Sequence, residues 1–104
     1  MSRRTGWAAV RVLRAVAQGA RYGFDIIDVT GLPSGTVYPA LSRHERDGYV
    51  TSSWEDLVKA HRDQRPPRRY YRITVQGKRA LDDALAELGI EPASVLRPSR
   101  ARAK

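Results

Sequence analysis

The sequence contains no cysteine and no long apolar run. Without cysteine, neither a disulfide nor a thiolate metal site can form. No stretch approaches the roughly 20 apolar residues that a membrane-spanning helix needs. The first residues, Met1–Gly6, lack the features of a secretory signal. His61 has no partner at metal-ligand spacing, and His44 is expected to be a hydrogen-bonded core residue rather than a pH or metal sensor. We therefore expect a cytoplasmic protein with no membrane contact, no metal and no cofactor.

Motifs of enzyme chemistry are missing as well. The chain has no nucleophile elbow, no phosphate-binding glycine loop, no paired carboxylates and no cluster of cysteine and histidine. We expect no catalytic residue and no enzymatic activity.

Acidic residues are few compared with basic ones. The chain has 19 Lys and Arg against 11 Asp and Glu, which gives a net charge of +8. Such an excess indicates a polyanionic partner, usually nucleic acid. Two segments concentrate the positive charge: residues 55–72 hold six cations and three acids, and residues 97–104 hold four cations and no acid.

Apolar periodicity predicts three helices in the first half of the 104-residue chain. The first spans Trp7–Gln18, with Thr5 as a candidate N-cap. The second spans Tyr22–Val29, with an inward face formed by Phe24, Ile27 and Val29. Gly31-Leu32-Pro33 ends it, because proline disfavours a helical conformation in the residue before it. The third spans Ser34–Asp47, capped by Ser34, and its apolar face is Val37, Leu41 and His44.

The second half changes to a strand period. Tyr49–Trp54 and Arg69–Thr74 are β-prone, and Val50, Ser52 and Trp54 alternate on one side of the first strand. Fourteen residues lie between the strands, in a segment that is rich in charge and contains Pro66-Pro67, and a connection of this length predicts a hairpin with a flexible tip. Thr74 caps a last helix, Val75–Leu88, with a narrow apolar seam.

This order of elements predicts a winged helix-turn-helix, an α+β fold that is mostly α, with a two-stranded wing and a C-terminal helix. We expect one such DNA-binding domain with its dimerisation helix over residues 1–90, and a basic, disordered tail over residues 91–104.

The third helix would then enter the major groove of double-stranded DNA. Ser34 and Thr36 near its start are expected to contact phosphates, and Ser42 and Arg43 to read sequence. The wing would add the phosphate contacts of Lys59, Arg65, Arg68 and Arg69.

Three motifs resemble the PadR-like transcriptional regulators. Gly35-Thr36-Val37-Tyr38-Pro39-Ala40-Leu41 resembles the recognition-helix motif of that family, S-x-G-T-L-Y-P-A-L. The family's wing motif, R-x-x-Y-Y-x-L-T-x-x-G, resembles Arg65-Pro66-Pro67-Arg68-Arg69-Tyr70-Tyr71-Arg72-Ile73-Thr74 followed by Gly77. The start of its second helix resembles Tyr22-Gly23-Phe24-Asp25-Ile26. The chain departs from the family at His44, where leucine is usual, and in a shorter C-terminal helix.

The resemblance implies a homodimeric repressor in which Thr36 and Tyr38 contact the DNA backbone. A small-molecule effector is a further candidate partner. We expect the dimer to involve the first and last helices, with the side chains of Trp7, Leu81, Leu85 and Leu88. Trp7 and Trp54 are candidate effector contacts, although structural packing is the simpler explanation for both. Two alternatives remain open: a non-specific architectural DNA-binding protein, and a winged helix used for protein or RNA interaction.

Overall fold

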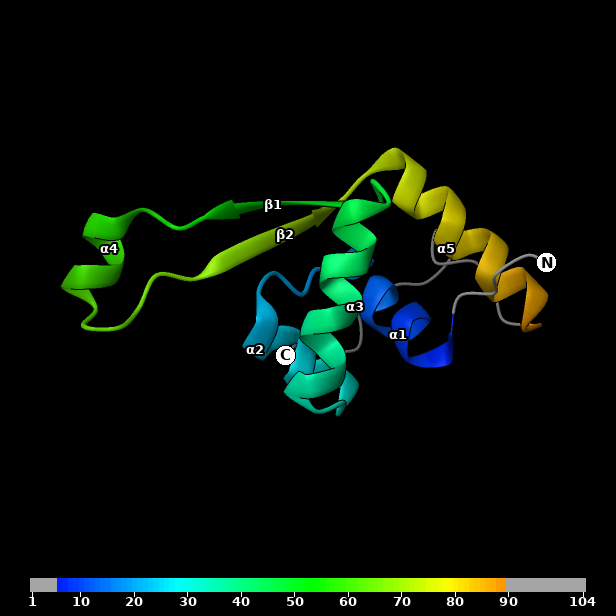
Figure 1. The fold of residues 1–104 in the computed structure, drawn as a ribbon, viewed down its shortest axis with the longest axis horizontal. Coiled ribbons are helices and arrows are strands. Elements are labelled where there is room, and N and C mark those ends of the chain that lie inside the picture. Colours follow the sequence, from blue (N-terminus) through cyan, green and yellow to red (C-terminus); the bar gives the residue numbers. More distant parts are fainter. Residues whose placement is uncertain (1–5, 90–104) are drawn as a thin grey trace.

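The computed structural model describes residues 6–89, which form five helices and a two-stranded antiparallel sheet. The elements are α1 (Trp7–Ala17), α2 (Gly23–Thr30), α3 (Ser34–Arg46), β1 (Val50–Trp54), α4 (Leu57–Arg62), β2 (Arg69–Ile73) and α5 (Val75–Glu87) (Figure 1). This architecture confirms the predicted winged helix-turn-helix. Thr5 and the basic tail at 91–104 lie outside the described residues.

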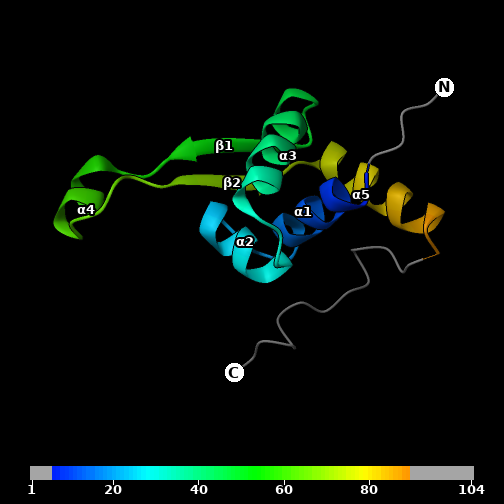
Figure 2. The same ribbon diagram turned by 60° about the horizontal axis from the view of Figure 1, so that its bottom comes forward.

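Helix α1 forms the centre of the core. Six of its eleven residues are buried, and it contacts α2, α3, α5 and β2. Its mixture of alanine and valine allows neighbouring helices to approach closely while still burying apolar area. Figures 1 and 2 show α3 and α5 beside α1, with the wing projecting away from this group of helices.

The turn between α2 and α3 is fixed by local hydrogen bonds. Gly31 ends α2 in the left-handed region, with a φ of 74°, which favours glycine because it has no Cβ. The Thr30 hydroxyl donates to the Ile26 carbonyl at 2.7 Å and accepts from the Leu32 amide at 3.1 Å. The guanidinium of Arg11 also donates to the Thr30 carbonyl, which joins this turn to α1.

The predicted inward face of α2 is partly wrong. Phe24 is 74% exposed and Val29 is 52% exposed, whereas Ile26 is fully buried. The buried positions are Gly23, Ile26 and Thr30, at spacings of three and four. A glycine and a threonine carry no strong hydropathy signal, so the sequence pattern misplaced the phase of this short helix.

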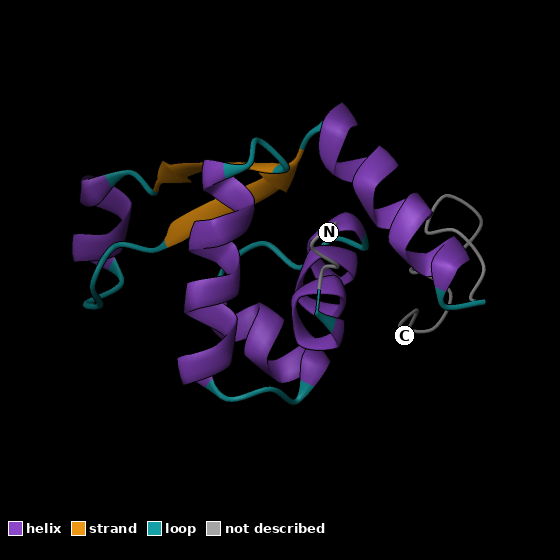
Figure 3. Cartoon of the chain, turned by 45° about the vertical axis from the view of Figure 1, so that its right-hand side comes forward, coloured by secondary structure: helices purple, strands orange, loops and turns teal. Residues whose placement is uncertain are grey.

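The connection between the strands contains a helix, so the prediction of a flexible tip is wrong. Asp56 caps α4 by accepting a hydrogen bond from the Val58 amide at 2.9 Å. The Ala60 side chain is buried, and the Ala60 carbonyl accepts a hydrogen bond from the Arg65 amide at 3.1 Å. Figure 3 shows α4 at the far end of the wing, beyond both strands.

The base of the wing joins α5 to the core. Val50 pairs with Ile73 and Ser52 with Tyr71, so these four side chains lie on the sheet face directed toward α3. Trp54 follows the same alternation but is 61% exposed, because the strand has left the core by that residue. Thr74 caps α5 as predicted, by accepting from the Gly77 amide at 2.9 Å.

Candidate nucleic-acid interface

Helix α3 has one face in the core and one face open to solvent. Val37, Leu41 and His44 are buried, as predicted. Most of the opposite side is exposed: Ser34, Gly35, Tyr38, Pro39, Ser42, Arg43 and Arg46. None of these exposed residues is acidic, so the face suits contact with the edges of bases and with phosphates.

The beginning of α3 presents unpaired backbone donors. The N-cap is Pro33 rather than the predicted Ser34, and it supplies no side-chain cap. The Thr36 and Val37 amides bond to the Pro33 carbonyl at 2.9 and 3.0 Å. The amides of Ser34 and Gly35 precede this first helical bond, so they can bind a phosphate at the positive end of the helix.

Tyr38 lies against the start of α2. A Cβ atom added at Gly23 would be 2.0 Å from the Tyr38 hydroxyl oxygen. The absence of a side chain at Gly23 therefore lets the Tyr38 ring approach the start of α2 closely. The sequence did not predict this contact, because Gly23 is notable in the sequence only as a member of the Tyr22–Ile26 motif.

His44 is a core residue with one hydrogen bond. Its Nε2 lies 2.9 Å from the Ala9 carbonyl and donates to it, since a carbonyl can only accept. Burial lowers the pKa of His44 below 6.5, which keeps the ring neutral. Its Nδ1 has no hydrogen-bond partner. His44 therefore connects α3 to α1 and takes no part in the exposed face.

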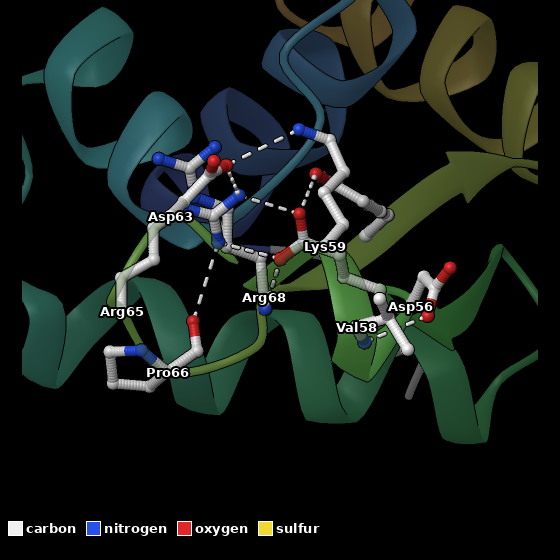
Figure 4. A network of polar contacts seen from close by, with 9 residues as sticks. Asp56, Val58, Lys59, Asp63, Arg65, Pro66 and Arg68 are labelled. Carbon is white, nitrogen blue, oxygen red and sulfur yellow. Dashed lines mark hydrogen bonds and ion pairs between the residues drawn. The ribbon is translucent and has the colours of Figure 1, made fainter. Parts of the chain in front are cut away.

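Arg65 is not a free cation, although the sequence placed it among the phosphate contacts. Its two Nη atoms each donate to Glu55 at 2.6 Å. Figure 4 shows Arg65 in a network of polar contacts with Asp63 and other residues of the wing connection. The Glu55 side chain is 2% exposed and the Arg65 side chain 20%. The hydrogen bonds from Arg65 lower the pKa of Glu55 from 4.5 to about 2. This pair neutralises its own charge and holds the two ends of the wing connection together.

The sequence did not identify Glu55. This carboxylate also accepts from the Arg68 amide at 3.0 Å, so it anchors the start of β2 as well as Arg65. In a charged segment, an acidic residue among cations is normally expected to lie on the solvated surface. A separation of ten residues also gives no indication that Glu55 and Arg65 form an ion pair.

The other predicted wing cations differ in how strongly they are bound by acidic or polar side chains of the protein itself. Arg69 donates to Ser52 at 3.0 Å and lies 3.4 Å from a Glu45 oxygen, which ties the wing to α3. Lys59 lies 3.4 Å from Asp63 in an exposed pair, which is too weak to prevent a phosphate contact. The guanidinium of Arg68 lies over the Tyr22 ring at 4.3 Å and has no acidic partner in residues 6–89.

The residues predicted for dimerisation fall into two groups. Leu81 and Leu85 are fully buried in the core of a single chain, so they hold α5 in place and cannot form a seam with a second copy. Trp7 is 50% exposed and Leu88 is 51% exposed. Only these two members of the set are open to a partner.

Residues 6–89 offer neither a metal cluster nor a membrane-spanning helix. Across this range no group of three or more histidine or acidic side chains is placed to hold a metal ion. No helix in the same range is long and apolar enough to cross a bilayer.

The fold and the exposed face of α3 define a winged helix-turn-helix DNA-binding protein. Residues 12–83 match the model of the transcriptional regulator PadR-like family. The chain belongs to this family, and is therefore a DNA-binding transcriptional regulator rather than a member of an enzyme family.

Solved structures agree with this assignment. A PadR family transcription regulator from Clostridium difficile is 24% identical, with a TM-score of 0.69 over 81% of this chain and 88% of that one. A PadR-like transcription factor from Bacteroides fragilis is 26% identical, with a TM-score of 0.66 over 78% of this chain and 79% of that one. A transcriptional regulator from Clostridium thermocellum is 25% identical, with a TM-score of 0.66 over 81% of this chain and 82% of that one. No curated protein sequence matches the chain.

Proposed function

We propose that this protein is a sequence-specific transcriptional repressor that binds an inverted repeat as a homodimer. The observation that carries the proposal is the division of α3 into a buried apolar face and an exposed face without acidic residues. A helix with such a face fits the major groove, where each base pair presents its own pattern of donors and acceptors.

Within this proposal the exposed residues of α3, together with the half-buried Thr36, have two roles. Ser34, Thr36 and Tyr38 lie at the positive end of α3 and bind phosphates. Ser42 and Arg43 lie one turn further along the exposed face and contact bases. Arg43 has no ion pair in residues 6–89, so its guanidinium is available for the paired acceptors of guanine.

The wing contributes phosphate contacts from a smaller set of cations than its composition suggests. Lys59 and Arg68 lack strong acidic partners and are the main contacts. Arg69 aligns the wing with α3 through Glu45 and Ser52, and contacts DNA with its remaining donors. Arg65 supports the wing from inside and makes no contact.

The dimer would use surfaces of α1 and α5 that remain exposed, with Trp7 and Leu88 as its apolar contacts. Two α3 helices that enter successive major grooves on one side of the duplex should lie about 34–36 Å apart. Repression then requires an operator that overlaps the promoter of a target gene.

Selection of bound fragments from random duplex DNA tests this proposal. A specific dimer should enrich an inverted repeat with half-sites about 10 base pairs apart. Light scattering of the full chain should give twice the mass of one chain, and a reporter placed behind the selected operator should lose expression when the protein is present. Enrichment of no sequence would indicate a non-specific architectural protein. A monomeric mass, or a reporter that gains expression, would contradict the dimer or the repressor role.

A further inference from the structure

A hollow lies on the face of the wing sheet that is directed away from α3. It has a volume of about 400 Å³ and a mainly polar lining. In the register of the sheet, Thr51 pairs with Arg72 and Ser53 with Tyr70. Successive residues of a strand point to opposite faces, so these four side chains share the face opposite to that of Val50. The volume is within the range of small-molecule sites, roughly 300–1,000 Å³.

Arg21 adds a third segment of chain to this face. Its carbonyl accepts from the Tyr71 amide at 2.7 Å, and the next residue, Tyr22, forms a β-bridge with Tyr70. The residues before α2 therefore lie along the edge of β2 that β1 leaves open. The guanidinium carbon of Arg21 is 5.3 Å from the centre of the Tyr70 ring, a distance at which an aromatic ring attracts a cation. This contact holds the charge of Arg21 beside the hollow, which both residues line.

The two arginines of the hollow are not neutralised by the protein. Neither Arg21 nor Arg72 forms an ion pair within residues 6–89. Asp25 accepts from the backbone amide of Arg21 at 3.1 Å, and Glu55 is bound to Arg65. Neither of these carboxylates lines the hollow. The hollow therefore has a positive charge that an anion can balance.

Two hydroxyl groups add hydrogen-bond donors to the same lining. Thr51 and Ser53 are exposed on β1, and their side chains form no hydrogen bond within the described part of the chain. Each hydroxyl can donate once, and each guanidinium can donate two parallel bonds to one anion. A carboxylate has two oxygens, whereas a phosphate group has at least three and carries up to two negative charges. The number of donors therefore favours phosphate over carboxylate.

We propose that this hollow binds a small molecule that carries phosphate groups, held by Arg21 and Arg72 and by the hydroxyls of Thr51 and Ser53. The volume of the hollow leaves room for a second phosphate or for an organic group beside the first. A small molecule is the occupant rather than duplex DNA, because the hollow is concave and faces away from α3. This inference does not rest on the proposed function.

Calorimetric titration of the full chain with inorganic pyrophosphate, at constant ionic strength, tests the site. Malonate, a dicarboxylate, is the matched ligand. We expect saturable binding of one pyrophosphate per chain. Malonate should bind roughly tenfold or more weakly, because it has fewer oxygens for the two guanidinium groups and the hydroxyls. Equal affinity for the two ligands, or no saturation by pyrophosphate below about 1 mM, would overturn the proposal.

Three variants with the same change of charge locate the site. Arg21→Gln and Arg72→Gln alter exposed side chains, and each should weaken pyrophosphate binding by roughly tenfold or more. Arg62→Gln removes an exposed arginine of α4, on the wing but outside the hollow, and should retain the wild-type affinity. Thermal melting checks that each variant is folded. Unchanged affinity in both hollow variants, or an equal loss in Arg62→Gln, would overturn the assignment.

Nuclear magnetic resonance gives a second reading that does not depend on variants. Pyrophosphate should shift the amide resonances of Thr51, Ser53 and Arg72, and the shifts should saturate at the concentrations found by calorimetry. Shifts confined to α3 would place the anion on the proposed DNA-binding face and would overturn the inference.

Fluorescence anisotropy of a labelled random duplex distinguishes the two sources of phosphate. Arg72→Gln should bind the duplex as tightly as Arg62→Gln does, although its affinity for pyrophosphate is lower. A loss of duplex affinity as large as the loss of pyrophosphate affinity would show that DNA phosphates occupy the hollow, and would overturn the assignment to a small molecule. Duplex binding without pyrophosphate binding would overturn this inference and leave the proposed function standing. Pyrophosphate binding by a chain that binds no duplex would do the reverse.

Discussion

Arg65 donates from both Nη atoms to the carboxylate of Glu55, at 2.6 Å in each case. The two residues are ten positions apart, and they lie on either side of α4. Their pairing closes the wing connection at its base. A segment that is strongly basic in composition therefore contains its own internal counter-charge, and its rigidity depends on that ion pair.

Removing Arg65 should loosen the wing rather than remove a DNA contact. Arg65→Ala leaves the Glu55 carboxylate buried without its partner, and an uncompensated buried charge destabilises its surroundings. We expect faster hydrogen exchange of the Val58 and Arg68 amides than in the wild type. Arg62→Ala, which changes an exposed arginine at the end of α4, is the matched control and should leave exchange unchanged. Equal exchange in the two variants would contradict the structural role of Arg65.

The same pair predicts a loss of stability in acid. The pKa of Glu55 is lowered from 4.5 to about 2 in the folded protein, so its contribution is complete above pH 4.5 and falls away between 4.5 and 2. Thermal melting across this window should show a falling midpoint, and Glu55→Gln should flatten the fall. A variant with the same pH dependence as the wild type would show that other carboxylates cause it.

His44 adds a second pH window. Burial lowers its pKa from 6.5, so the folded state prefers the neutral ring, and stability should decrease as the pH falls below 6.5. His44→Leu removes this dependence and the unpartnered Nδ1, but also the bond to the Ala9 carbonyl. We expect the melting midpoint of His44→Leu to be insensitive to pH between roughly 7 and 5.5. A midpoint that still falls as in the wild type would mean that His44 is not the titrating group.

Gly77 is required by a close approach of backbone. A Cβ atom there would lie 2.1 Å from the Tyr49 carbonyl oxygen, which cannot move aside as a flexible side chain would. Gly77→Ala should therefore lower the free energy of unfolding by about 3 kcal/mol. Gly35→Ala, in the first turn of α3 with open space around it, should instead raise it by about 0.5–1 kcal/mol. Denaturant unfolding of both variants checks the pair, and a Gly77→Ala protein as stable as the wild type would show that the approach is not tight.

Gly23 tests the position of Tyr38. The hydroxyl that a Cβ would meet is the far end of a partly exposed side chain, so Gly23→Ala should displace the Tyr38 ring at small cost in stability. Because Tyr38 is proposed to bind phosphate, we expect weaker binding to all duplexes, by a factor similar to that of Tyr38→Ala. The double variant should bind no more weakly than either single variant. Additive losses would mean that Gly23 acts independently of Tyr38.

The sequence predicted the order of the main elements because their periods are clear. The alternation that begins at Val50 predicts a strand, and the spacing of Val37, Leu41 and His44 predicts which face of α3 is buried. The family motifs pointed to the same fold. The exposed face of α3 follows directly, since it is the complement of the buried one.

The remaining features depend on contacts between distant residues. Phe24 was expected to be buried because it is strongly apolar. The hydropathy of a residue does not show whether a neighbouring element covers that side of α2. Arg65 was counted as free because its partner is recognisable only when the wing is folded. Leu81 and Leu85 formed a plausible dimer seam until the structure placed α1 against them. In each case the missing information was the identity of a neighbour.

The affinity for a selected operator and for random duplex, measured at one salt concentration with wild type and Arg43→Ala, tests the central claim most directly. We predict that the wild type binds its operator roughly 10³-fold or more tighter than random duplex. In Arg43→Ala this preference should fall by about 1–3 kcal/mol, while affinity for random duplex changes little. A wild-type ratio near one, or an unchanged preference in the variant, would contradict the assignment of α3 as the helix that reads sequence.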